Sequence, residues 1–332
     1  MAKYSVVIPA YNVENYISDC IGSLKAQSFL DFEVVIINDG SCDNTENVCR
    51  ELIKNDSRFK LISQKNQGPV RTRINGFNNS SGEYVVFLDS DDYISLNRLE
   101  EFERLLCSDI DIDLIVASYS TFDGVNSNPI TNYFSAGIYD LEKINTEILP
   151  NLLAAKPHFN FGIKPSLWEC CFKREILEKC INNVPDGITI GEDMCLTYSY
   201  LLECKKIAIS NDSGYFYRNN ATSLTHTCNA KQLDETIVLF DFVRNLPVPT
   251  ENWKAQVEEY TLYMAWYIIR KVLKAENITW CNKIEMLNSY CNQISINQCI
   301  KNTNNLEMSF RRKFRYLCIK RRSGKNKYHL KR

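Results

Sequence analysis

The chain has 332 residues, of which 45% are hydrophobic, enough for one large domain or two smaller ones with a buried core. Its formal net charge of −1 excludes a protein that binds nucleic acid through an overall basic charge. The charge is uneven, because residues 311–332 contain eleven Lys or Arg and no Asp or Glu. Subtracting +11 from −1 leaves about −12 for residues 1–310, so the body is acidic and the tail basic.

Strand-like and helix-like segments alternate through the first 120 residues. Four short apolar runs read as strands buried on both faces, and segments with apolar residues at helical spacing separate them. This alternation predicts an α/β fold with a Rossmann-like, mostly parallel sheet that is flanked by helices. The expected strands are 4–10, 32–39, 58–64 and 84–89, and the expected helices are 13–27, 44–55 and 69–80.

The pattern becomes less regular beyond residue 110, and the last third reads as helical. We therefore expect a helical C-terminal region beside the α/β fold. The expected elements are a strand at 112–122, a polar loop at 123–135, a mostly helical stretch at 141–204, two short strands within 205–220 and helices from 231 to 291.

The cysteines and the apolar runs indicate the cellular compartment in which we expect the protein. Fourteen cysteines include no C-x-x-C pair, so we expect reduced thiols in a cytoplasmic protein. No zinc site is expected, because none of the three histidines has ligand spacing to a cysteine. The N-terminus lacks the pattern of a signal peptide. The best membrane-span candidate, 260–269, is half as long as the roughly 20 residues that a bilayer requires.

Polar clusters follow each of the first four expected strands. In a parallel sheet, ligands bind beyond the carboxyl ends of the strands, so four such loops together outline one site. The clusters are PAYN after residue 8, NDGS after residue 37, KNQG after residue 64 and DSDD after residue 88.

The DSDD cluster, residues 89–92, predicts a metal site. Asp89 and Asp91 can share one divalent cation with the phosphates of a ligand, since hard cations prefer oxygen ligands. A bound cation would also offset the repulsion among these carboxylates. The alternative is that Asp91 or Asp92 caps the helix that follows.

The first loop contains no glycine, which excludes two classes of phosphate site. Dinucleotide binders need G-x-G-x-x-G there, and P-loop proteins need a glycine-rich loop with a lysine. Phosphate would then be held by a metal and by Arg71 and Arg73. The alternative is that these two arginines lie on a solvated helix face and bind nothing. Asp39 in NDGS can accept from the ring N–H of a pyrimidine, although NDGS is also a common turn sequence.

Two further stretches come from the second half of the chain. Glu192 and Asp193 precede an apolar helical stripe, where they either supply a carboxylate base or favour the helix dipole. Arg218, Ser223 and His226 lie in YFYRNNATSLTH, which reads either as a phosphate-contacting lid or as a surface loop.

Five stretches together resemble family 2 inverting glycosyltransferases of the GT-A fold, of the bacterial type that builds surface polysaccharide such as capsule or O-antigen. They follow in the order and spacing of that family, and the resemblance covers about residues 3–225. One departure is TRI at 72–74, where members often read A-R-N. The five stretches are VVIPAYNVENYI, VVIINDGSCDNT, KNQGPVRTRINGF, GEYVVFLDSDDY and IGEDMCLTY.

The resemblance implies a donor site for a nucleotide diphosphate sugar, with UDP-sugar expected. Asp91 would hold Mn²⁺ or Mg²⁺, and Asp89 would contact the ribose or the metal's water. Arg218 would contact the diphosphate. The other implied donor residues are Pro9, Tyr11 and Glu14 at the nucleotide pocket, Asp39 at the base and Arg73 near the nucleotide.

The resemblance also implies the acceptor side. Asp193 would be the base that deprotonates a hydroxyl of a glycan or lipid-linked acceptor, supported by Glu192, and Trp168 would shape the acceptor site. Two alternatives stay open: a sugar nucleotidyltransferase, which also binds a nucleotide with aspartates and metal, and a catalytically silent nucleotide-sugar-binding scaffold.

We expect three regions: a GT-A nucleotide-sugar-binding and catalytic domain (1–225), a helical region (226–307) and a basic amphipathic tail (308–332). Apolar residues between the cations of the tail predict contact with anionic lipid, which would place the protein peripherally on the inner face of the cell membrane. The alternatives for the tail are disorder or nonspecific contact with nucleic acid; no specific nucleic acid is expected. Helices within 231–291 offer a surface for a homodimer.

Overall fold

A computed structural model describes residues 2–153, 160–185, 188–219, 231–275 and 278–292. The strands are β1 (Tyr4–Ala10), β2 (Phe32–Asn38), β3 (Phe59–Ser63), β4 (Tyr84–Phe87), β5 (Tyr93–Ile94), β6 (Leu114–Ala117), β7 (Tyr119–Phe122), β8 (Ser127–Ile130), β9 (Gly137–Asp140), β10 (Cys170–Lys173), β11 (Lys206–Ser210) and β12 (Tyr215–Arg218).

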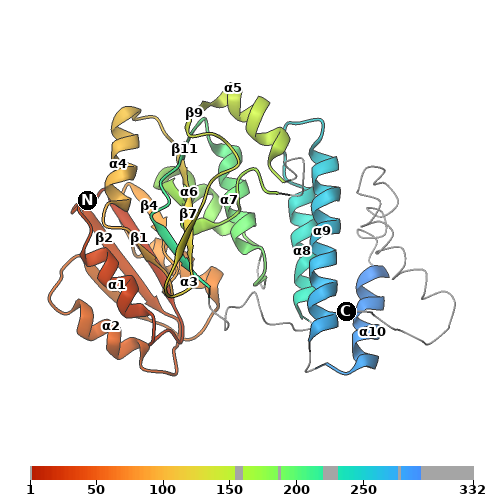
Figure 1. Cartoon of the computed structure of the whole chain (residues 1–332), viewed down its shortest axis with the longest axis horizontal. Coiled ribbons are helices and arrows are strands. Elements are labelled where there is room, and N and C mark those ends of the chain that lie inside the picture. Colours follow the sequence, from red (N-terminus) through yellow and green to blue (C-terminus); the bar gives the residue numbers. More distant parts are fainter. Residues whose placement is uncertain (1, 154–159, 186–187, 220–230, 276–277, 293–332) are drawn as a thin grey trace.

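Helices surround these strands and form the C-terminal part of the described chain (Figure 1). They are α1 (Ile17–Lys25), α2 (Thr45–Ile53), α3 (Pro69–Asn78), α4 (Arg98–Ser108), α5 (Leu141–Lys143), α6 (Arg174–Cys180), α7 (Glu192–Glu203), α8 (Lys231–Arg244), α9 (Trp253–Lys274) and α10 (Trp280–Asn292), with short helical turns η1 (Ile144–Ile148), η2 (Leu149–Asn151), η3 (Leu167–Glu169) and η4 (Ile181–Asn183).

The central sheet has the strand order β3-β2-β1-β4-β10-β6-β11-β9. Strands β1 to β4 are parallel, and β6 is parallel to β11. Strand β10 runs antiparallel between β4 and β6, and β9 runs antiparallel to β11 at the edge. The prediction of a mostly parallel sheet flanked by helices is therefore confirmed.

Each face of the sheet has its own hydrophobic core, because successive strand residues point to opposite faces. In β1, Val6 and Ile8 pack with residues of α1, α2 and α4. The intervening Val7 packs with residues of α3, α6 and α7 on the opposite face. This double burial explains why β1 is apolar at both alternating sets of positions.

The predicted helical C-terminal region is present. Leu239 and Phe240 of α8 and Tyr260 of α9 belong to the same hydrophobic core as α7. In Figure 1, α8 and α9 stand beside α7, and α10 lies on the far side of α9. None of the described helices is both long and apolar enough to cross a membrane.

The expected single strand at 112–122 is wrong, because two strands occupy it. Pairing of β6 with β11 ends at Ala117, and the chain then leaves the central sheet. Strand β7 pairs with β12 in a second sheet of order β5-β12-β7-β8. Strand β8 of this sheet lies within 123–135, which we expected to be a polar loop.

The expected helical stretch at 141–204 contains strand β10, which the prediction missed. Its Cys171 pairs with Val86 of β4 and with Ile115 of β6. A buried run of four residues has no periodicity that separates a strand from a helix. The two short strands expected within 205–220 are confirmed as β11 and β12.

Because β1 to β4 are parallel, their carboxyl ends share one edge, and the four polar loops meet there. This edge carries the first half of the predicted site. Ser223 and His226, and the basic tail at 308–332, lie outside the described residues.

Candidate active site

Arg73 is the residue around which the predicted site assembles. It lies on the buried face of α3 and is 8% exposed. The helix begins with Pro69, a position that needs no backbone N–H donor. A Cβ on Gly76 would lie 2.3 Å from Val7 Cγ1, so the glycine lets α3 approach β1 closely.

Three predicted carboxylates surround the Arg73 guanidinium. Its Nη2 donates to Asp89 Oδ1 at 3.0 Å. Its Nη1 lies 3.2 Å from Asp193 Oδ1 and 3.5 Å from Glu192 Oε1. Asp89 follows β4 and the other two open α7, so carboxylates from two distant stretches of the chain share one cation.

One guanidinium cannot neutralise three carboxylates. Burial lowers the pKa of Arg73, but Asp193, Asp89 and Glu192 outweigh it and leave the pKa raised. Burial raises the pKa of Glu192, and repulsion by Asp193 adds to that rise. Burial also raises the pKa of Asp193 against the opposing effect of Arg73. The site therefore holds excess negative charge and favours proton uptake at the Glu192–Asp193 pair.

Asp193 carries a buried oxygen that accepts no hydrogen bond among the described residues. A backbone hydrogen bond from Leu167 orients its carboxylate. Its Oδ1 is buried and, although close to Arg73, has no hydrogen-bond donor among the described residues. A buried acceptor without a donor is costly, so it marks a position where a ligand hydroxyl can bind.

Helix α8 holds the loop that delivers these carboxylates. The backbone N–H and hydroxyl of Thr189 both donate to Glu235 Oε2, at 3.0 Å and 2.7 Å. Gly191 has φ +80°, and a Cβ there would lie 2.4 Å from Leu239 Cδ2. The sequence analysis missed Glu235, because a contact across 46 residues leaves no local pattern.

Asp92 of the DSDD loop has contacts that do not involve Arg73. Asp92 is buried, accepts from the Tyr215 hydroxyl at 2.6 Å and from the Arg218 backbone N–H at 2.7 Å. Burial, with repulsion from Asp91 and Asp89, raises the pKa of Asp92 to about 8. Asp92 thus joins the DSDD loop to β12, a connection that the sequence analysis did not assign.

Arg218 is the last residue of β12, and it contacts the DSDD loop from the side. Its Nε donates to the Asp91 carbonyl at 2.9 Å, and its Nη2 donates to Asp19 Oδ2 at 2.8 Å. Its guanidinium lies 5.3 Å from the ring centre of Tyr16. These contacts place Arg218 beside Asp91, one of the two predicted metal-binding residues.

Asp39 is buried and organises the third loop. Its Oδ1 accepts from Gln64 Nε2 at 2.7 Å and from the Gln67 backbone N–H at 2.9 Å. Its Oδ2 accepts from the Gly68 backbone N–H at 2.9 Å. Asp39 therefore shapes the loop that leads into α3, and Oδ2, which accepts a single hydrogen bond, retains a second lone pair for a ligand.

The loop after β1 is tied to the loop after β2. The Asn12 side chain accepts from the Cys42 backbone N–H at 2.8 Å, and Glu14 Oε2 accepts from the Asn44 backbone N–H at 2.8 Å. Tyr11 is 49% exposed, and Pro9 is half-buried within β1. Pro9 thus lies near the end of β1, and Tyr11 and Glu14 lie on the loop that follows, which hydrogen bonds join to the loop after β2.

Trp168 is packed in an aromatic stack. Its ring lies 4.5 Å from the ring centre of Tyr215 and 5.5 Å from that of Tyr217. Its neighbour Leu167 bonds Asp193, and Tyr215 bonds Asp92. The stack therefore links the predicted base to the DSDD loop. Ile74, where the chain departs from the family pattern, lines an apolar hollow beside Arg73.

The carboxylates present fit a metal ion that is shared with a bound ligand, but not a metal ion held by protein groups alone. Within the part of the chain that the structure describes, no cluster of three or more His, Cys, Asp or Glu has the geometry of a metal site. Mg²⁺ is commonly held by one or two carboxylates plus substrate phosphates. Asp89 and Asp91 match that donor set. Burial is the main cause of the raised pKa of Asp92, and repulsion from Asp91 and Asp89 adds to it.

Comparison with known proteins identifies relatives. A family model described as Glycosyl transferase family 2 matches residues 5–170. GlyA of Streptococcus pneumoniae serotype 4 is 31% identical over 229 residues, which is 69% of this chain and 32% of GlyA. GlyG of the same organism is 26% identical over 67% of this chain and 73% of GlyG. The chain thus spans about a third of one relative and most of the other.

Two solved structures share the fold. Staphylococcus aureus TarS 1–349, in complex with UDP-GlcNAc, aligns with TM-score 0.65 and 20% identity over 90% of this chain and 83% of that one. A mannosyltransferase from Pyrobaculum calidifontis, in complex with GDP-Man and Mn²⁺, aligns with TM-score 0.53 and 13% identity over 90% of this chain and 84% of that one. These alignments support the predicted GT-A-like architecture.

Proposed function

The chain belongs to glycosyl transferase family 2, and from that premise we propose that it transfers a sugar from a nucleotide diphosphate sugar to a hydroxyl of a glycan or lipid-linked acceptor. UDP-sugar is the proposed donor, with inversion at the anomeric carbon. The observation that carries the proposal is the convergence of Asp89 and Asp193 on Arg73. Donor-side and base-side carboxylates thereby face one region.

On the donor side, Asp89 and Asp91 would hold Mn²⁺ or Mg²⁺ together with the diphosphate. A bound divalent cation would stabilise the charge that develops on the leaving diphosphate. Arg73 holds Asp89 in place through the 3.0 Å hydrogen bond. Arg218 lies next to Asp91 and would contribute positive charge to the diphosphate side. Asp39, with Pro9, Tyr11 and Glu14 on the neighbouring loops, would bind the nucleoside.

On the acceptor side, Asp193 would act as the general base. The acceptor oxygen would form a bond to the anomeric carbon while the bond from that carbon to the phosphate oxygen breaks. The proton would pass to Asp193, and the nucleotide diphosphate would leave with the bonding electrons. Asp193 Oδ1 supports this assignment because it has no hydrogen-bond donor among the described residues. Glu192 would tune the pKa of Asp193, and Trp168 would shape the acceptor side.

A donor screen tests the proposal. The full chain is incubated with a panel of UDP-sugars and Mn²⁺ or Mg²⁺, with and without a lipid-linked acceptor, and UDP release is measured. We expect acceptor-stimulated UDP release that EDTA abolishes. Pyrophosphate release from UTP would indicate a nucleotidyltransferase instead, and donor binding without turnover would indicate a silent scaffold.

The regional assignments are proposals of the same kind. Residues 1–225 would form the transfer domain, followed by the helical region 226–307, which could also carry a homodimer contact. Residues 308–332 would hold the protein at an anionic membrane surface. Co-sedimentation with anionic liposomes, compared between the full chain and a chain ending at residue 307, checks the last point. Equal binding would contradict it.

A further inference from the structure

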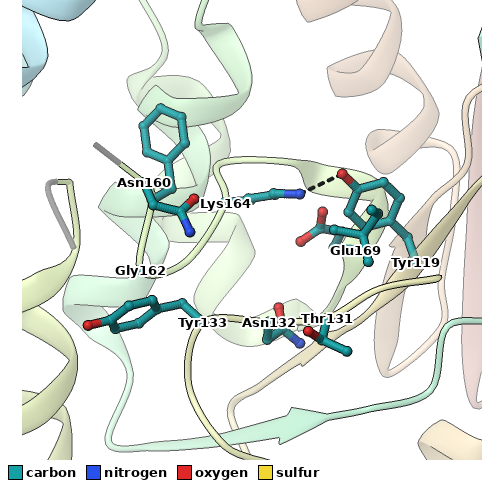
Figure 2. A pocket seen from close by; sticks show the side chains of 10 residues that line it. Tyr119, Thr131, Asn132, Tyr133, Asn160, Gly162, Lys164 and Glu169 are labelled. Atoms are coloured by element: carbon teal, nitrogen blue, oxygen red, sulfur yellow. Dashed lines mark hydrogen bonds between the residues drawn. The ribbon is translucent and has the colours of Figure 1, made fainter. Parts of the chain in front are cut away.

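A cavity of about 110 Å³ lies outside the residues assigned above. It is bounded by the segment after β8, by residues 160–164 and by Glu169 at the end of η3. Figure 2 shows the Lys164 ammonium and the Glu169 carboxyl on one side of the space, and Asn132 and Tyr133 on the side opposite Lys164. The wall therefore mixes hydrogen-bonding groups with aromatic rings.

Glu169 is the unusual member of this wall. The residue is 1% exposed, and its Oε1 is buried with no hydrogen-bond donor among the described residues. Burial raises the pKa of Glu169 to about 8, with partial opposition from Lys164 and Arg98. A protonated carboxyl can both donate and accept, so Glu169 is suited to a hydroxyl partner.

Lys164 adds a cation that is already oriented. Its ammonium hydrogen-bonds the Tyr119 hydroxyl and lies 4.2 Å from the centre of that ring. An ammonium has three donors, so two remain for other partners. On the facing side, the Asn132 side-chain amide donates to the Ser210 carbonyl at 3.1 Å, and this hydrogen bond anchors the side chain of Asn132.

The cavity is one short helical turn away from the predicted base. Turn η3 consists of Leu167, Trp168 and Glu169. Leu167, at its start, bonds the Asp193 carboxylate, and Glu169, at its end, lines the cavity. Because a 3₁₀ turn rises roughly 2 Å per residue, Leu167 and Glu169 lie about 4 Å apart along the turn. One turn therefore carries both the residue that bonds Asp193 and the residue that lines the cavity.

We infer that this cavity binds a hydroxyl-rich unit of the acceptor, a saccharide ring or an open-chain polyol, through Glu169 and Lys164. Adjacent hydroxyls match a wall in which donors and acceptors alternate beside aromatic rings. The inference rests on the proposed function, which it deepens by assigning the place and the chemical class of the acceptor group. Neither residue belongs to the proposed donor site or to the proposed base.

Binding is tested first without any donor. Saturation-transfer NMR on the full chain uses two probes, a methyl glycoside panel and ribitol, so that the ring and the open-chain polyol are distinguished. We expect E169L and K164M to weaken binding at least about 10-fold, as expected for loss of a hydrogen bond to a charged or buried group. E169Q, which keeps both a donor and an acceptor, is expected to bind within about 3-fold of wild type.

Matched controls are E51L and K54M, which change an exposed pair on α2. Thermal unfolding of every variant checks that it is folded. If E169L does not fold, K164M alone decides the test. Binding of both probes by E169L or K164M at wild-type strength would overturn the inference, as would absence of binding to wild type.

Kinetics then separate this inference from the proposed function. With a donor that supports transfer, K164M should raise the acceptor KM more than E169Q does. Neither variant should change the donor KM. Normal donor turnover with an unaltered acceptor KM in K164M would refute the cavity assignment alone. If wild type turns over no nucleotide sugar, the proposed function fails, while glycoside binding still decides whether the cavity is a saccharide site.

Discussion

The donor edge and the acceptor side of this molecule differ in how completely their polar groups are paired. At the donor edge, Asp39, Asn12 and Glu14 accept hydrogen bonds from neighbouring loops, so the loops are ordered before any ligand arrives. On the acceptor side, Asp193 Oδ1 and Glu169 Oε1 are buried without hydrogen-bond donors in the described part of the chain. Buried acceptors that lack a hydrogen-bond donor therefore mark the side where we expect proton transfer and acceptor binding.

The largest effect is expected from D193N, which removes the proposed base while retaining the shape of the side chain. An amide cannot take the acceptor proton, so kcat should fall about 10²–10⁴-fold. Donor affinity, measured by calorimetry with a UDP-sugar, should change little, because the donor-edge contacts remain. The control is D111N, which changes an exposed carboxylate. Wild-type kcat in D193N would remove Asp193 from its assigned role.

Breaking the link between the two sides should cost stability as well as activity. R73M leaves Asp89, Glu192 and Asp193 without their shared cation, and removing one partner of a buried ion pair costs roughly 3–5 kcal/mol. Because the loss falls on ionised carboxylates, urea unfolding should show a greater difference at pH 8 than at pH 5. R104M, at an exposed ion pair, is the control and should be near neutral.

On the donor edge, D39N should weaken donor binding without a matching change in kcat. An asparagine presents N–H groups where Asp39 now accepts from Gln64, Gln67 and Gly68, and an unpaired buried group costs about 1–3 kcal/mol. The donor KM should rise as the loop before α3 loses its order. A fall in kcat at unchanged donor KM would contradict the assignment of Asp39 to binding.

A final expected effect concerns Glu169 and the pH dependence of the free energy of unfolding. Its pKa is raised from 4.5 to about 8, so the folded protein keeps a proton that the unfolded chain releases. Stability must then fall as pH rises between these values. E169Q cannot titrate, so its free energy of unfolding should gain on wild type across that range and level off above it. Parallel pH curves in urea unfolding would show that Glu169 is ionised in the fold.

Several features were predictable because their signals are local. The parallel strands β1 to β4 appeared as short apolar runs separated by helical stripes, and their shared edge followed from their direction. The sequence analysis had named all the carboxylates that meet at Arg73, because strand-end aspartates and an acidic pair before a helix are local sequence patterns. The structure brings Asp89, Glu192 and Asp193 together at Arg73, whereas the roles of these residues stay predictions.

Other features could not be predicted. Strand β10 inserts between β4 and β6 from a stretch that reads as helical, and β7 leaves the sheet that β6 belongs to. The support that Glu235 gives to Thr189, and the burial of Glu169 in a cavity wall, depend on residues far away along the chain.

The sequence by itself determined the strand-and-helix alternation, the family and the candidate carboxylates, since periodicity and composition express local burial directly. Only the tertiary structure decided which of those carboxylates share one guanidinium, and which buried oxygens lack a donor. The physical reason is that pairing and desolvation depend on distances between segments that are remote in the chain, and no local pattern encodes those distances.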